Sequence, residues 1–333
     1  MPPCSAPAEA GRRVSRATTP PAAAPPGLPA TAPRSWLFVP GDSERKQQRA
    51  LESNADALIL DLEDSVAPAQ LPRAREQVAQ LLRSRRAGTG PALWVRVNAP
   101  TSGLLRTDLA EMCAAGALPD GVLLPKVSAA DQIIDVAEYL STLERGFGRA
   151  SGSTRLLVLA TETPAGLLTL PQYPSALGGT LALGRLAGLT WGAEDLSVAL
   201  GASAKRDASG ALTFTFQLAR TSCLLAAAAL AVQAIDGVWT DLRDPHGLER
   251  ELADARRDGF SGKLAIHPDQ LAAINAAFAP TAAERAHAQR VVAAFAAAAG
   301  AGVASLDGQM IDRPHLLQAQ RILAVAQRTG DGL

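Results

Sequence analysis

The chain has 333 residues, 47% of them hydrophobic, so it can bury a large core, and one α/β barrel of about 250 residues plus extensions would account for its length. Lys plus Arg and Asp plus Glu each number 32, so no overall electrostatic field attracts nucleic acid or an anionic membrane. The cysteines, Cys4, Cys113 and Cys223, are odd in number and far apart, which argues against a disulfide framework and predicts a cytoplasmic protein.

Residues 1–33 form a segment rich in Ala and Pro, with several Arg and only one acid, Glu9. Such a composition cannot bury enough apolar surface to offset the entropy of ordering, so we predict a disordered tail. An organellar transit peptide is the alternative, because the segment is basic and poor in acids. Its prolines argue against the amphipathic helix that a transit peptide needs.

From residue 34 to 280, short apolar runs alternate with segments of helical period, which predicts βα units and a parallel sheet. The predicted strands are Ser35–Val39, Ala57–Leu60, Leu93–Val97, Val122–Pro125, Leu156–Ala160, Leu189–Gly192, Val238–Thr240 and Leu264–His267. Eight repeats favour a closed TIM (β/α)8 barrel. A doubly wound open sheet is the alternative, but no GxGxxG turn follows the first strand.

Helices with readable starts lie between these strands. Ser43 precedes a helix over Glu44–Ser53, Ser128 and Asp131 form a predicted capping box, and Pro268 opens a helix through Phe278. Glycine-containing turns are expected before three strands, at residues 120–121, 236–237 and 261–262. The apolar run Cys223–Val232 is too short to cross a bilayer, so we predict a buried helix and no membrane contact.

Residues 281–333 extend beyond the eighth strand as a predicted C-terminal helical extension and lid. An Ala-rich helix is expected around Ala282–Ala299, followed by a tail that contains residues 308–314, Gly-Gln-Met-Ile-Asp-Arg-Pro.

Polar residues follow nearly every predicted strand, and the C-terminal strand ends are where a barrel carries its chemistry. Glu162 and Asp195 follow adjacent strands and could offer oxygen ligands to one Mg2+. Glu162 is also a candidate for substrate binding. The alternative is that Asp195 caps the helix beginning at Leu196 and Glu162 stabilises the turn at Thr163.

Arg96 ends the third strand, where its guanidinium would grip a substrate carboxylate, or would pair with Asp61 or Glu63 instead. Arg34, before the first strand, is a weaker candidate for substrate binding.

Two further strand-end residues have structural and functional interpretations. Lys126 could form a Schiff base, but the surrounding carboxylates should keep its pKa high, which favours an ion pair. His267 could be a general base or a hydrogen-bonded packing residue.

Taken together, the motifs resemble the citrate lyase β-subunit and malyl-CoA lyase family over about residues 34–320. The matching segments are residues 34–41 (RSWLFVPG), 55–56 (AD), 61–66 (DLEDSV), 95–98 (VRVN), 124–127 (LPKV), 162–164 (ETP), 192–196 (GAEDL) and 265–268 (AIHP). One departure is the stretch Ser175–Leu186, which makes the interval from Glu162 to Asp195 longer than the family pattern.

The resemblance implies a TIM barrel assembled into homotrimers or homohexamers, with Mg2+ on Glu162 and Asp195 and a carboxylate on Arg96. It also implies a lid that closes over a neighbouring subunit, with Asp312 as the acid/base residue and Arg96 as the second candidate catalytic residue. The alternative for Asp312 is a turn in the tail.

The implied activity is a Mg-dependent carbon–carbon lyase that joins or splits an acyl-CoA enolate and a 2-keto acid. Its partners would be a CoA thioester and a small keto or hydroxy acid. A malyl-CoA-type thioesterase, a CoA-independent pyruvate aldolase and a non-catalytic CoA-ester binding subunit remain open alternatives.

Overall fold

The computed structural model describes residues 32–85, 89–298 and 302–328; the tail predicted for residues 1–33 lies almost wholly outside these ranges. Eight parallel strands close into a barrel, each paired with the next along the chain and β1 paired with β8. The strands are β1 Ser35–Pro40, β2 Ala57–Asp61, β3 Ala92–Arg96, β4 Gly121–Leu124, β5 Arg155–Leu159, β6 Leu186–Thr190, β7 Gln233–Asp236 and β8 Gly262–Ala265. The predicted TIM barrel is confirmed, and the open sheet is wrong.

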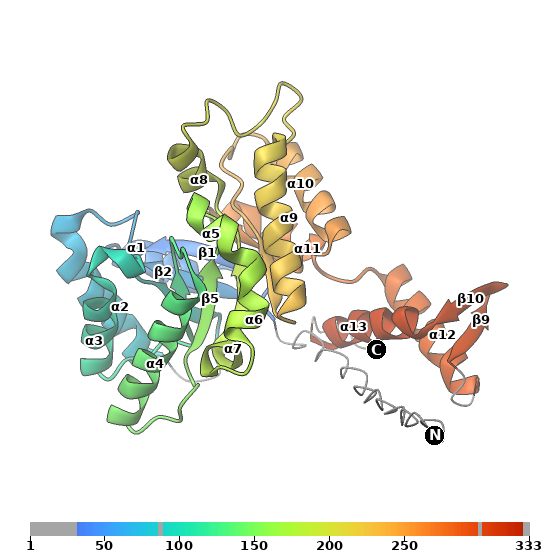
Figure 1. Ribbon diagram of the computed structural model, residues 1–333, viewed down its shortest axis with the longest axis horizontal. Coiled ribbons are helices and arrows are strands. Elements are labelled where there is room, and N and C mark those ends of the chain that lie inside the picture. Colours follow the sequence, from blue (N-terminus) through green and yellow to red (C-terminus); the bar gives the residue numbers. More distant parts are fainter. Residues whose placement is uncertain (1–31, 86–88, 299–301, 329–333) are drawn as a thin grey trace, which may run out of the picture.

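Helices surround the barrel (Figure 1). They are α1 Glu44–Leu51, α2 Leu71–Ser84, α3 Leu105–Ala114, α4 Ala130–Gly146, α5 Pro164–Thr169, α6 Tyr173–Leu177, α7 Leu181–Arg185, α8 Ala193–Leu200, α9 Phe214–Ala229, α10 Pro245–Asp258 and α11 Leu271–Ala277. Short 3-10 turns stand at Pro68–Gln70, Pro100–Ser102, Leu170–Gln172 and Pro268–Gln270.

The strands are buried on both faces, as a parallel barrel requires. Alternate residues fill the interior, where Trp36 of β1 meets Trp94 of β3 edge to face at 5.0 Å although these strands are not neighbours. The intervening residues, such as Leu58 and Leu60, pack outward against the helices in the larger core.

The prediction of the seventh strand was wrong. The strand is Gln233–Asp236, and residues 236–237 end it instead of forming a turn before it. Its first and last residues, Gln233 and Asp236, are polar but can be buried because their side chains are hydrogen-bonded. Gln233 Nε2 donates to the Pro33 carbonyl at 2.7 Å, and Asp236 accepts hydrogen bonds from three side chains. Gly121 and Gly262 are likewise the first residues of β4 and β8, not residues of the preceding turns.

The helix starts were predicted unevenly. Ser43 is the N-cap residue of α1 and Pro268 opens the last barrel helix segment, as expected. The predicted capping box at Ser128 was wrong, because α4 begins at Ala130 with Ala129 as its N-cap residue. The Ser128 N–H donates to Gln132 Oε1 at 2.8 Å. The run Cys223–Val232, predicted as a buried helix, is helical to Ala229 at the end of α9 but is buried on one face only, because Cys223 and Ala227 are fully buried whereas Leu225 is 64% exposed.

The C-terminal unit consists of α12 Ala282–Ala297, the antiparallel strands β9 Val303–Leu306 and β10 Gln309–Asp312, and α13 Arg313–Arg328. It has a small core of its own, formed by Ala288, Val291, Ile311 and Ala319. Figure 1 shows this unit projecting to one side of the barrel. The long helix was expected and the hairpin was not.

Among the helices of residues 32–85, 89–298 and 302–328, none has the length and apolar character needed to cross a membrane.

Candidate active site

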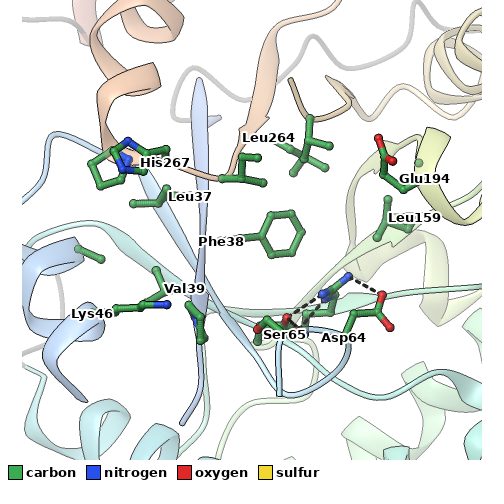
Figure 2. A pocket seen from close by; sticks show the side chains of 18 of the residues that line it. Leu37, Phe38, Val39, Lys46, Asp64, Ser65, Leu159, Glu194, Leu264 and His267 are labelled. Carbon is green, nitrogen blue, oxygen red and sulfur yellow. Dashed lines mark hydrogen bonds and ion pairs between the residues drawn. The ribbon is translucent and has the colours of Figure 1, made fainter. Parts of the chain in front are cut away.

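A cavity of about 630 Å³ opens at the C-terminal ends of the strands. Its wall combines apolar residues of β1 with polar residues at, or shortly after, the C-terminal ends of β2, β3, β5, β6 and β8. Figure 2 shows Phe38 pointing into this cavity, with Leu264 above it and Ser65 and Asp64 below. The polar lining residues include Asp61, Asp64, Ser65, Arg96, Glu162, Glu194, Asp195 and His267.

Arg96 is held rigidly at the end of β3. Its Nε and Nη2 donate to the two oxygens of Asp61 at 2.6 and 2.7 Å, and Nη1 lies 3.1 Å from Glu63 Oε2. The guanidinium also stands over the Phe38 ring, 4.9 Å from its centroid. Burial opposes its charge, but these carboxylates raise the pKa of Arg96 above its ordinary value. The predicted ion pair is therefore present, and the same guanidinium lines the cavity as a substrate-binding group must.

Lys126 follows β4 in a left-handed conformation, with φ of 52°. This backbone geometry lets its N–H donate to Glu162 Oε2 at 2.6 Å while its Nζ reaches Glu63 at 2.6 Å and Asp64 at 3.0 Å. Although burial lowers the pKa of Lys126, these acids raise it above the ordinary value. The ion pairs that the acidic cluster predicted are therefore present, and they favour the charged form of Lys126 over the neutral amine that a Schiff base needs.

Glu162 and Asp195 converge from β5 and β6. Glu162 is 4% exposed, whereas Asp195 lies in the first turn of α8 with its side chain partly open to the cavity. Burial raises the pKa of Glu162 to about 8; the Lys126 N–H opposes the rise, and the negative charge of Asp195 adds to it. Two carboxylates therefore lie close to each other in the wall of the cavity, and nearby hydrogen-bond donors and cations offset only part of their mutual repulsion.

This pair fits a hard divalent ion. Gly192 leaves room beside Glu162, because a Cβ there would lie 2.7 Å from Glu162 Cγ. Within the described ranges no group of three or more His, Cys, Asp or Glu side chains could hold a metal. Two carboxylates with the remaining positions left to water and substrate are the donor set that Mg2+ uses, so the residues fit that ion better than a metal that needs a closed protein cage.

Three comparisons with known proteins place the chain among its relatives. Residues 34–268 match the model of the HpcH/HpaI aldolase/citrate lyase family. The chain belongs to this family. The expected family is thus confirmed, as is the expectation of a carbon–carbon lyase family built on a barrel.

Individual relatives cover most of the chain. A mitochondrial citramalyl-CoA lyase of Rattus norvegicus is 34% identical over 300 residues, 88% of this chain and 86% of the relative. A (3S)-malyl-CoA thioesterase of Cereibacter sphaeroides is 35% identical over 296 residues, 88% of this chain and 94% of the relative. The solved structure of CitE from Mycobacterium tuberculosis, in complex with magnesium, acetoacetate and coenzyme A, superimposes with a TM-score of 0.68 at 34% identity, covering 90% of this chain and 99% of that one.

Two other residues singled out in the sequence, Arg34 and His267, lie in different places. Arg34 is at the opposite, N-terminal end of β1, where Nε and Nη2 pair with Asp56 at 2.9 and 3.1 Å. It does not line the cavity, so the structure gives no support for its predicted contact with substrate. His267 lines the cavity, and its Nδ1 accepts the Asp269 N–H at 3.3 Å as a helix cap.

Asp312 is the last residue of β10 and is absent from the cavity lining. Its Oδ1 lies 2.5 Å from His315 Nδ1 in the C-terminal unit. An acid/base role would therefore require the cavity of another subunit, and it stays a prediction.

Sequence reasoning missed three cations on α1: Arg45, Lys46 and Arg49 all line the cavity. A signal was present, because the helix that directly follows strand 1 of a barrel begins at the mouth. Their spacing along one helix resembles an ordinary solvated face, which is why they attracted no attention.

Proposed function

We propose that this protein is a Mg-dependent CoA-ester lyase that cleaves or forms the carbon–carbon bond between an acyl-CoA enolate and a 2-keto acid. The observation that carries the proposal is the convergence of Glu162 and Asp195 beside the clamped guanidinium of Arg96 in one cavity. The names of the relatives, which act on citramalyl-CoA and malyl-CoA, and the CitE complex with magnesium and coenzyme A support this reading.

The cavity provides a place for each end of such a substrate. The Nε and Nη2 edge of Arg96 is occupied by Asp61, so the carboxylate of the keto acid would meet the remaining N–H groups of Nη1 and Nη2, with Phe38 as an apolar wall beside it. Arg45, Lys46 and Arg49 form a basic rim suited to the phosphates of CoA. The neutral overall charge is compatible with this, because a local group of three cations is enough to attract an anionic ligand.

Glu162 and Asp195 would hold the metal, which when bound supplies Lewis acidity for negative charge that develops on a substrate oxygen. In the cleavage direction a base accepts the hydroxyl proton of the substrate, the hydroxyl-bearing carbon becomes the carbonyl of the keto acid, and the electron pair of the broken carbon–carbon bond passes to the thioester enolate. A proton then adds to the enolate carbon. Asp312 of a neighbouring subunit is our candidate for that proton transfer, within a predicted homotrimer or homohexamer.

A substrate panel tests the proposal. Purified protein with Mg2+ is incubated with citramalyl-CoA, malyl-CoA and citryl-CoA, and keto acid, acetyl-CoA and free CoA are quantified separately. We expect keto acid and acetyl-CoA in equal amounts, with activity abolished in Asp195→Ala together with stabilisation by Mg2+. Full activity and unchanged Mg2+ stabilisation in that variant would refute the metal assignment.

Thioester hydrolysis is the second candidate, favoured by the similarity to the (3S)-malyl-CoA thioesterase. The same panel separates the two, since hydrolysis releases free CoA and the intact hydroxy acid without acetyl-CoA. The cytoplasmic location also stays a prediction, supported by the free, buried thiols of Cys113 and Cys223.

A further inference from the structure

A group of buried charges lies behind the candidate site, between β7, β8 and the helices α9 and α10. Asp236 and Lys263 have fully buried side chains, and Lys263 Nζ lies 3.0 Å from Asp236 Oδ2 and 2.7 Å from Glu251 Oε1. Arg220 Nε donates to Asp236 Oδ1 at 2.9 Å. Burying so many charges costs desolvation free energy, and hydrophobic residues of similar volume often give a core at least the same stability. Stability alone therefore does not explain this arrangement.

One hydrogen bond connects this group to the cavity. The indole Nε1 of Trp191 donates to Asp236 Oδ1 at 2.7 Å. Trp191 is 3% exposed, follows the last residue of β6, and belongs to the cavity wall. Because Asp236 is itself held by Arg220 and Lys263, the acceptor for the indole is fixed in place.

The residues after Trp191 join the two proposed metal ligands. Gly192 packs so closely on Glu162 that an added Cβ would lie 2.7 Å from its Cγ and 3.2 Å from its Oε1. The Gly192 N–H donates to Thr161 Oγ1 at 3.3 Å, and α8 then begins at Ala193 with Asp195 in its first turn. The position of the segment 191–195 therefore sets the spacing between the carboxylates of Glu162 and Asp195.

We propose that Asp236 is a positioning residue for the metal pair, acting through its hydrogen bond to Trp191. The inference rests on the proposed function, because it assumes that Glu162 and Asp195 bind Mg2+. Neither Asp236 nor Trp191 touches the ion; the bond fixes the start of α8 against Glu162, so that both carboxylates are placed before the metal arrives.

The test is Trp191→Phe in the full chain, which removes the indole N–H and keeps an aromatic ring. Outer-shell partners of metal ligands typically contribute 10–100-fold in affinity, so we expect Mg2+ binding by calorimetry to weaken about tenfold. We also expect amide hydrogen exchange of residues 191–197, measured by mass spectrometry without Mg2+, to become faster. A cooperative thermal unfolding transition shows that the variant used in both measurements is folded.

Trp239→Phe is the matched control, since its indole also donates a 2.7 Å hydrogen bond, to the Asp241 carbonyl, but outside the segment 191–195. It should leave Mg2+ affinity and exchange at residues 191–197 near those of the wild type. Equal losses in the two variants, or unchanged affinity and exchange in Trp191→Phe, would overturn the positioning role. If Asp195→Asn also leaves Mg2+ binding unchanged, the proposed metal site itself fails, which separates the two outcomes.

Discussion

At the residue scale, close contacts and compensated charges decide what each position tolerates. The interior of the barrel is filled by large rings, and Gly121 exists at the start of β4 because Trp94 occupies the space beside it. A Cβ at Gly121 would lie 2.2 Å from the Trp94 ring, closer than real carbon atoms approach. The smallest side chain on one strand is thus dictated by the largest on its neighbour.

Gly121→Ala should consequently destabilise the barrel by about 1–3 kcal/mol through overpacking. Urea unfolding measures the change. Gly184→Ala is the control, because a Cβ at Gly184 in α7 meets no atom within 4 Å, and it should be neutral or slightly stabilising. Equal stability of the two variants would contradict the packing argument.

A second residue-scale prediction concerns the buried pair Glu144–Arg185, whose closest atoms are 2.5 Å apart. Burial alone would raise the pKa of Glu144, but hydrogen bonds from Arg185 and from the N–H groups of Thr154 and Gly152 lower it to about 2 from its ordinary 4.5. The depressed pKa stabilises the fold fully above pH ~4.5, and that contribution disappears as pH falls towards 2.

We expect this carboxylate to contribute about 3 kcal/mol, since one pKa unit corresponds to about 1.4 kcal/mol. Unfolding free energy measured between pH 5 and 2.5 should fall more steeply in the wild type than in Glu144→Gln, which cannot titrate. Parallel curves for the two proteins would show that Glu144 gains nothing from ionisation.

At the scale of elements, the strand ends were the most predictable part of the chain. Arg96, Lys126, Glu162 and Asp195 could be placed at one mouth because apolar runs end at them and parallel strands share a direction. The seventh strand could not, because its ends are Gln233 and Asp236, whose burial depends on partners far along the chain. Lys263 in β8 is likewise buried because its charge is paired with those of Asp236 and Glu251. A hydropathy pattern does not show which charged residues will find such partners.

The C-terminal hairpin was missed for a different reason. Each of its strands has only four residues, so β9 and β10 give no periodic pattern of useful length. The turn between them is made at Asp307 and Gly308, both with positive φ. Asp312 therefore lies at the junction between β10 and α13. From composition alone, the same segment was consistent with a turn in the tail.

Asp312→Asn should lower turnover by about 10²-fold or more if the carboxyl transfers a proton, while Mg2+ affinity stays near that of the wild type. Because Asp312 does not line the cavity of its own chain, mixing Asp312→Asn with Asp195→Ala subunits should restore part of the activity. Steady-state kinetics on the separate and mixed variants provides the measurement. No recovery on mixing, together with an unaffected rate in Asp312→Asn, would return Asp312 to a structural role.

At the scale of the whole molecule, the hydrophobic cluster of the C-terminal unit is separate, among the described residues, from the two clusters of the barrel. The barrel core is continuous through the helix layer, whereas Ile311 belongs to the small cluster between α12, α13 and the hairpin. Units that do not share a core need not unfold together, so a single cooperative transition is not required.

Calorimetry should therefore show two transitions for the full chain. Ile311→Ala, which truncates a nearly buried side chain, should lower only the smaller one, by about 2–5 kcal/mol of unfolding free energy. Leu58→Ala, in the barrel, is the reciprocal control and should lower the larger transition. A single peak that shifts equally in both variants would mean that the two parts unfold as one.

Closure of the barrel has a consequence for aggregation. Each of its eight strands has a neighbour on both sides, so none offers unpaired backbone groups to a foreign strand. Within the described part of the chain, β9 and β10 pair only with each other, and they carry the exposed side chains of Met310, at 76% exposure, and Val303. When this protein is stressed, intermolecular sheet growth should begin in residues 303–312, and a charge introduced at Met310 is the substitution that would block it.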